Sequence, residues 1–140
     1  MNVKKLRKDA ILPTKATADS AGFDLYSPED FLIYPGATEK INTGLAVEIP
    51  HGFFGGIFAR SGLATKQGLA PANKVGVIDA DYRGPLVVAL HNHGEEAQSI
   101  KAGDRIAQLV ILPVVQTTIV EVEELDETER GEGGFGSTGK

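Results

Sequence analysis

The feature that most constrains the fold of this chain is a series of short β-type runs, each bounded by Gly, Pro, Asn or Asp. Seven runs are predicted as strands: Phe31–Tyr34, Thr43–Ile49, Phe53–Ala59, Val75–Ile78, Leu86–Leu90, Arg105–Leu112 and Val114–Val122. The charged segment Lys4–Lys8 is predicted as a solvated edge strand. This spacing of short strands predicts an all-β barrel or sandwich.

A single segment, Ser61–Gly68, has the pattern of a helix, with one or two turns at most. Ser61 is the predicted N-cap, and Gly68 is the predicted stop. The segment could serve only to connect two strands. Alternatively, Arg60 and Ser61 could stand at a helix N-terminus whose free N–H groups attract an anion.

The composition restricts the classes of function. A length of 140 residues suits one domain with a real core. The absence of cysteine excludes disulfides, thiolate metal sites and cysteine nucleophiles. A net charge of -5 argues against a polymeric nucleic acid as partner. Four of the five arginines lie in glycine-bearing motifs, namely Arg60, Arg83, Arg105 and Arg130. Because the planar guanidinium group suits phosphate, this distribution hints at a site for a small phosphorylated ligand.

The sequence predicts no secretion signal at the N-terminus and no membrane-spanning segment. No apolar stretch of signal-peptide length follows the charged N-terminus. The longest apolar run, Leu109 to Val115, contains a proline and is far too short to span a bilayer. We therefore expect no membrane association and a cytoplasmic location, or a nuclear or organellar one in a eukaryote.

The character of the sequence changes after Val122, where acidic residues and then glycines accumulate. We divide the chain into a β domain, residues 1–125, and a flexible glycine-rich arm, residues 126–140. The arm is too polar to fold alone and could be a frayed terminus. The arm could instead be a lid that becomes ordered when a ligand binds, because it carries groups suited to ligand contact. These are the ring of Phe135, the guanidinium of Arg130 and the hydroxyls of Ser137 and Thr138.

The stretch from Gly76 to Pro85 has the pattern of a β-hairpin with an acidic residue at its mouth. Val77 and Val87 would lie on opposite arms. Asp79 and Asp81 could be turn residues, and Tyr82 could belong to the core. These residues therefore indicate a candidate site without establishing one.

Taken together, five ordered motifs resemble those of the trimeric dUTPases. They are Ala21–Ser27, Arg60–Ala64, Asn73–Gly84, Gly103–Leu109 and Arg130–Gly139, and they fill almost the whole chain. A single short motif would be weak, whereas five in order at suitable spacing are specific. The chain departs from the family at Ala59, where proline usually precedes the arginine.

The resemblance implies a jelly-roll-like homotrimer whose three active sites are each built from several subunits. It further implies Mg²⁺-dependent hydrolysis of dUTP to dUMP and pyrophosphate. That reaction would limit uracil incorporation into DNA and supply dUMP for thymidylate synthesis.

The resemblance also implies the roles of individual residues. Asp79 would be the general base, and Asp24 with Gln108 would hold a hydrated Mg²⁺ through its waters. The phosphates would be bound by two sets of residues, one in the helical segment and one in the arm: Arg60, Ser61 and Gly62, then Arg130, Gly136, Ser137 and Thr138.

Selection of the base and sugar follows the same resemblance. Main-chain groups of the 76–87 segment would bind uracil, namely those of Gly76, Val77, Ile78 and Val87. The side-chain amide of Asn73 would assist them. Cytosine would leave fixed partners unpaired, at a cost of ~1–3 kcal/mol each. Tyr82 would exclude a ribose 2′-hydroxyl, and Phe135 would stack on the uracil.

Two other functions share this scaffold. A dCTP deaminase would need a catalytic glutamate near the 76–92 stretch, which contains none. A regulatory, non-enzymatic nucleotide binder would have lost Asp79 or the arm, and both are present. A metal site at His51, His91 and His93 is disfavoured, because their turn-like and strand-end positions predict surface placement. We also predict a structural ion pair between Asp104 and Arg105.

Overall fold

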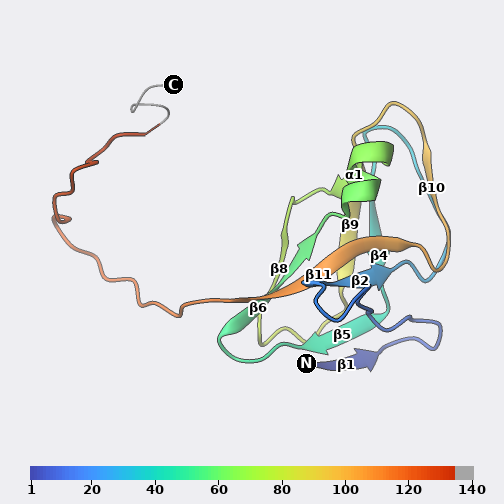
Figure 1. Cartoon of the computed structure of the whole chain (residues 1–140), viewed down its shortest axis with the longest axis horizontal. Helices are drawn as coiled ribbons and strands as arrows, with labels where there is room; N and C mark the ends of the chain where they lie inside the picture. The colour runs from blue at the N-terminus through green and yellow to red at the C-terminus, as the bar shows by residue number, and fades with distance from the viewer. Residues whose placement is uncertain (135–140) are drawn as a thin grey trace.

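The computed structural model describes residues 1–134, and strands dominate its regular structure (Figure 1). Within these residues the single helix is α1 (Ser61–Gln67). The strands in chain order are β1 (Asn2–Lys5), β2 (Gly22–Tyr26), β3 (Phe31–Ile33), β4 (Thr38–Asn42), β5 (Leu45–Glu48), β6 (Phe53–Phe58), β7 (Leu69–Pro71), β8 (Gly76–Ile78), β9 (Val87–Asn92), β10 (Gln98–Ile100) and β11 (Arg105–Pro113). The predicted all-β, jelly-roll-like class is confirmed.

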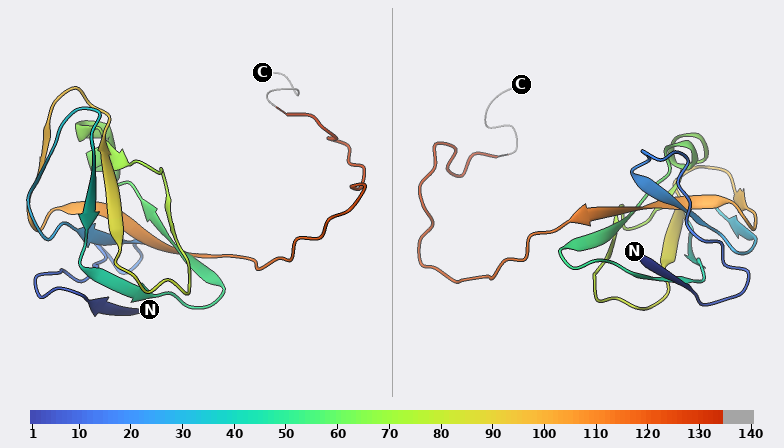
Figure 2. Two further views of the ribbon diagram at one scale, coloured as in Figure 1. Left: turned by 180° about the vertical axis from the view of Figure 1, so that it is seen from behind. Right: turned by 60° about the horizontal axis from the view of Figure 1, so that its bottom comes forward.

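The strands pair in antiparallel fashion to form four small sheets. The largest has the order β2-β11-β6-β8, and the next has the order β4-β9-β7. Two strand pairs, β1-β5 and β10-β3, complete the body. In the two further views the strands surround a shared interior, with α1 at one end of it (Figure 2).

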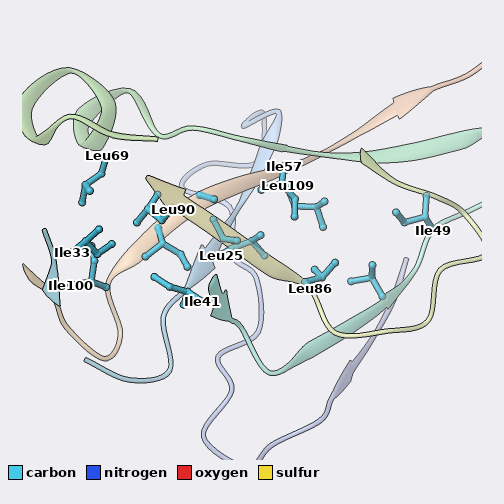
Figure 3. Close-up of a cluster of buried hydrophobic side chains, with 14 residues drawn as sticks. Leu25, Ile33, Ile41, Ile49, Ile57, Leu69, Leu86, Leu90, Ile100 and Leu109 are labelled. Atoms are coloured by element: carbon cyan, nitrogen blue, oxygen red, sulfur yellow. The ribbon is translucent and has the colours of Figure 1, made fainter. Parts of the chain in front are cut away.

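All four sheets contribute side chains to one hydrophobic core (Figure 3). Strand β9 shows how the sequence directs them, since alternate side chains Val88, Leu90 and Asn92 are buried. Leu25 and Leu109 enter from the largest sheet, and both are completely buried. Because no sheet has enough apolar surface alone, the four sheets are stable only when packed together.

Six of the seven predicted strands are present, with ends shifted by no more than two residues. The predicted strand at Val114–Val122 is wrong, because β11 ends at Pro113 and the following residues are irregular. Ile119 and Val120 are 95% and 71% exposed. A run of high β propensity becomes a strand only where another strand pairs with it, and no described residue of this chain does so here. The N-terminal strand lies at Asn2–Lys5, earlier than predicted, and it is an edge strand.

Helix α1 differs from the prediction at its first residue. Arg60 occupies the N-cap position, and no side chain caps the helix, so Ser61 is the first helical residue instead of the cap. The predicted stop is confirmed, because Gly68 adopts the left-handed conformation with φ 67°. None of the helices in residues 1–134 is long and apolar enough to cross a bilayer.

Asn92 is a buried polar residue that joins three parts of the fold. Its side-chain Nδ2 donates to the Ile33 carbonyl at 2.9 Å and to the Glu96 carbonyl at 2.8 Å. Its Oδ1 accepts from the Gly94 N–H at 2.9 Å. Because the side chain is fully enclosed, removing these three bonds would leave backbone polar groups without this partner in the interior.

Asn92→Leu should therefore strongly destabilise the protein, since each buried group left unpaired costs about 1–3 kcal/mol. We expect the melting temperature to fall by about 10 °C or more at fixed protein concentration. Asn42→Ala is the control, because exposed Asn42 makes one such bond, to the Gly44 N–H. A melting temperature as high for Asn92→Leu as for this control would refute the role of Asn92.

Candidate active site

Asp24 is the centre of one group of predicted site residues. It lies in β2, and its side chain is only 11% exposed. Its Oδ1 accepts from Arg60 Nε at 3.0 Å, and its Oδ2 accepts from Arg105 Nη1 at 3.3 Å. A carboxylate enclosed by protein is stable only when paired, and here two guanidinium groups pair with it. Asp24 therefore fixes the direction of both arginines.

Gln108 lies next to Asp24 across the β2–β11 ladder. The two residues are direct cross-strand partners, so their side chains share one face of the sheet. The Gln108 amide lies over Gly22, where an added Cβ would be 2.8 Å from Oε1. The glycine thus leaves room for the glutamine amide beside the carboxylate.

The chemistry of Asp24 and Gln108 suits a hydrated cation. Each Asp24 oxygen already accepts from a guanidinium, so direct ligation would compete with an ion pair. The remaining lone pairs can accept from the waters of Mg²⁺, which retains several waters in proteins. Among residues 1–134, no three His, Cys, Asp or Glu side chains gather as direct metal ligands. The pair therefore fits an outer-sphere Mg²⁺ contact.

Arg105 is a site residue that the sequence prediction missed. Its predicted ion pair with Asp104 is wrong, because Asp104 Oδ2 instead accepts from the Lys101 N–H at 2.8 Å. Arg105 begins β11, which places its guanidinium next to Asp24 on β2. Its place among the arginines of glycine-bearing motifs was the available signal, but its partner 81 positions earlier was not readable from the sequence.

Ser61 and Gly62 begin α1 directly after Arg60. Both are exposed, and an added Cβ at Gly62 would meet nothing within 4 Å. The first N–H groups of a helix have no partner within the helix. Arg60, Ser61 and Gly62 therefore present a guanidinium and unpaired donors at the same end of β6.

The second group of predicted residues follows β7 and runs to β9. The predicted hairpin is wrong, because β8 pairs with β6 whereas β9 pairs with β4 and β7. Residues 79–86 instead cross from one sheet to the other. Within the described chain β8 has β6 as its one partner, so its other edge leaves backbone groups unpaired by a strand. Asn73 lies beside this strand, with Nδ2 3.4 Å from the position of a Cβ at Gly76.

Asp79 opens onto a cleft of about 760 Å³. The cleft is lined by residues from the β5–β6 turn, β8 and the start of the C-terminal segment: His51, Gly52, Phe53, Phe54, Val77, Asp79, Ala80, Asp81, Val114 and Gln116. Val77 is 63% exposed and Asp79 is also exposed. Ile78 is half-buried against the core, whereas Tyr82 and Val87 are exposed near the cross-over.

One chain does not bring the two groups together. Strand register places Ile78 opposite Gly55, so Asp79 lies near the Phe54 end of β6. Arg60 follows the Phe58 end, four residues away, which corresponds to roughly 13 Å or more along the strand. Figure 1 likewise shows α1 at one end of the body and the 79–86 cross-over at the other.

The predicted residues of the arm are only partly described. Arg130 is exposed, and its Nε donates to the Gly133 carbonyl at 2.8 Å. The described hydrogen bonds of residues 126–134 connect these residues with one another. Four further predicted contacts lie outside the described residues: Phe135, Gly136, Ser137 and Thr138.

The histidines form no metal centre in residues 1–134. His51 and His93 are exposed, as predicted, whereas His91 is half-buried and its Nδ1 lies 2.8 Å from Thr38 Oγ1. The rings of His91 and His93 are 4.4 Å apart between centroids. Desolvation, and then the nearby His91 and Lys74, lower the pKa of His93.

Comparison with known proteins places this chain in a family. The dUTPase family model matches residues 8–139. The deoxyuridine 5'-triphosphate nucleotidohydrolase of Nautilia profundicola is 55% identical over 140 residues, which cover 100% of this chain and 99% of that protein. The Desulfitobacterium hafniense protein of the same name is 52% identical over 144 residues, with 99% and 95% covered.

Solved structures agree with the sequence relatives. A mutant Staphylococcus bacteriophage 80alpha dUTPase with dUpNHpp has a TM-score of 0.93 at 33% identity, covering 99% of this chain and 98% of that one. A mutant dUTPase from phage phi11 of S. aureus has a TM-score of 0.80 at 30% identity, covering 88% and 96%. Its structure concerns the coordination of a structural Mg(II) ion. Since the family match spans nearly the whole sequence and the relatives match it end to end, this chain belongs to the dUTPase family.

Proposed function

We propose that this protein hydrolyses dUTP to dUMP and pyrophosphate. The observation that carries the proposal is the full-length match to dUTP nucleotidohydrolases, in a chain that retains the acid at Asp79 on an open cleft. A related structure contains dUpNHpp, an analogue of dUTP, which supports a nucleoside triphosphate as the ligand. The reaction would keep uracil out of DNA and supply dUMP for thymidylate synthesis.

In this proposal Asp79 orients and deprotonates the water that attacks the α-phosphorus in line. The bond between the α-phosphorus and the α–β bridging oxygen breaks, and pyrophosphate leaves with that oxygen. Arg60, with the N–H groups near Ser61 and Gly62, neutralises and holds the phosphates. Asp24 aims Arg60 at them, because it accepts from Nε. The Arg60 Nη1 donates to the Arg105 carbonyl at 3.4 Å, so Nη2 is the terminal nitrogen available to a phosphate.

Mg²⁺ is the proposed cofactor, and when bound it would neutralise charge on the phosphate oxygens. Asp24 and Gln108 would hold it through its waters. The support is the donor set at these two residues; the phi11 relative, whose structure concerns a structural Mg(II) ion, is in addition a related protein that binds this metal.

Uracil selection is proposed to use the free edge of β8. Main-chain groups of Gly76, Val77 and Ile78 can pair with the fixed donors and acceptors of one base, and Val87, at the start of β9, is proposed to contribute as well. The Asn73 amide lies next to Gly76 and can assist. Tyr82 is proposed to exclude a ribose hydroxyl, and Phe135 is proposed to cover the base.

The active form is proposed to be a homotrimer with shared sites, as is typical of the family. One physical argument is the separation of Arg60 and Asp79 at the two ends of β6, which is too long for both to serve one α-phosphorus. Another is the exposed apolar segment that follows β11, which includes Val115, Ile119, Val120 and Leu125. Such a segment needs a covering surface, and another copy would provide one.

Residues 126–140 are proposed to form a separate arm that closes the site. Arg130, Gly136, Ser137 and Thr138 would bind the γ-phosphate. A segment this rich in glycine and charge cannot pay its ordering entropy by burial alone, so closure requires the bound triphosphate.

Asp79→Asn tests the base. It preserves shape but removes the proton acceptor, so we expect turnover of dUTP to fall by about 100-fold or more with substrate binding retained. Pyrophosphate release and equilibrium binding of dUpNHpp are the measurements. Asp81→Asn, in the same turn, is the control and should retain most activity. Near wild-type turnover in Asp79→Asn would assign the base elsewhere.

A mixture of two inactive variants tests the shared site. Arg60→Lys retains charge beside Asp24 but loses the fork that holds phosphate. When Arg60→Lys and Asp79→Asn chains assemble at random into trimers, about a quarter of the sites would combine both intact residues. When the two chains are refolded together in equal amounts, pyrophosphate release should recover to about a quarter of the wild-type rate. No recovery, in mixtures shown by native mass spectrometry to be mixed trimers, would place both residues in one subunit.

Truncation after Glu129 tests the arm. The described residues 130–134 make no hydrogen bonds to the body, so removal should leave the melting temperature and the assembly nearly unchanged. We expect kcat to fall steeply, because the γ-phosphate contacts and the cover over the base are lost. Normal hydrolysis of dUTP by the truncated protein would refute the lid.

A further inference from the structure

The cross-over that carries Asp79 is closed by its own hydrogen bonds. The Tyr82 N–H donates to the Asp79 carbonyl at 3.1 Å, which forms a turn over residues 79–82. The Tyr82 hydroxyl donates to the Pro85 carbonyl at 3.1 Å. Its ring lies over Gly84, where an added Cβ would be 2.6 Å from Cζ. Backbone and side chain thus shape the turn that presents Asp79 and Tyr82.

Arg83 holds the same turn from outside the cleft. Its Nη1 donates to the Ala80 carbonyl at 2.7 Å and to the Tyr82 carbonyl at 3.0 Å. These carbonyls belong to the residue after Asp79 and to Tyr82 itself. One guanidinium nitrogen therefore restrains two residues of the turn, Ala80 and Tyr82.

The other end of the guanidinium connects the turn to the body. Arg83 Nη2 lies 3.8 Å from Glu48 Oε1 at the end of β5. Glu48 Oε2 accepts from Asn2 Nδ2 at 2.7 Å, and Asn2 is the β1 residue paired with Glu48. A continuous set of polar contacts thus joins the Asp79 turn to the β1–β5 ladder.

The ion pair of Arg83 contributes little to stability, and within one chain Arg83 lies outside the Asp79 cleft. The Arg83 and Glu48 side chains are 54% and 53% exposed, and exposed ion pairs contribute little to stability. Arg83 lines the groove over β1 and β5, of about 370 Å³, and is not among the residues lining the Asp79 cleft. Its contacts instead restrain the geometry of a turn that has little packing of its own.

We propose that Arg83 is a positioning residue for the reaction: it fixes the turn that presents Asp79 to water and Tyr82 to the sugar. The inference rests on the proposed function of this site. Glu48 and Asn2 are the anchor for Arg83. Because displacing a reacting group by about an ångström can cost up to about 100-fold in rate, a small movement of this turn matters.

Arg83→Ala, Arg83→Lys and Glu48→Gln test the proposal with dUTP as substrate. We expect Arg83→Ala to lower kcat by about 10- to 100-fold with KM within about twofold. The preference for dUTP over UTP should narrow, because Tyr82 loses its restraint. Arg83→Lys should recover much of kcat, since one ammonium can donate to both carbonyls. Glu48→Gln should lower kcat less than Arg83→Ala, because it loosens only the anchor.

Lys101→Ala is the matched control, because it removes another exposed ion pair, the one from Lys101 Nζ to Asp30 at 2.9 Å. It should leave kcat, KM and the UTP ratio unchanged. The melting temperature and trimer content of every variant should remain close to wild type.

Three results would overturn the proposal. A rise in KM of tenfold or more at constant kcat would make Arg83 a direct substrate ligand. Loss of assembly with normal kcat per assembled trimer would make it a subunit contact. An unchanged kcat in Arg83→Ala would remove any role. Failure of the proposed function is separate, because it would appear as absent wild-type turnover of dUTP or as active Asp79→Asn.

Discussion

The candidate site depends on the backbone ladder around β11. This strand is hydrogen bonded to β2 on one side and to β6 on the other, and β6 in turn pairs with β8. The β2 register places Gln108 opposite Asp24. The β6 register determines how far Asp79 lies from Arg60. Because side chains alternate between faces, a shift of one residue in the β2–β11 ladder would place Asp24 and Gln108 on opposite faces of the sheet.

The same ladder keeps the two groups of predicted site residues apart within one chain. Asp24, Arg60, Arg105 and Gln108 gather where β2 and β11 meet the end of β6. Asp79 opens at the far end. A rigid strand between the two groups prevents them from approaching within a chain. The proposed shared site between copies would use both groups on one triphosphate.

The charged groups show a division between strong and weak interactions. Asp24 is enclosed and paired with two arginines, so it is expected to contribute to both stability and geometry. Arg83 is exposed, and its hydrogen bonds go to backbone carbonyls of a short turn. Such contacts add little to the free energy of unfolding but restrict the conformations of a loop. Disrupting the Asp24 cluster is therefore expected to lower both stability and activity, whereas removing the Arg83 side chain is expected to change activity with little change in stability.

The sequence by itself determined the β class, six of the seven predicted strands, the glycine at the end of α1 and the family. These features depend on local patterns and ordered motifs, which are readable along the chain. It missed β2, β4, β7 and β10, which are only three to five residues long. The tertiary structure decided that Val114–Val122 is no strand and that β8 and β9 lie in different sheets. It also decided that Arg105 and Asp24 meet across 81 positions. The physical reason is that strand pairing and ion pairing join distant segments, and propensity along the chain does not identify the partner.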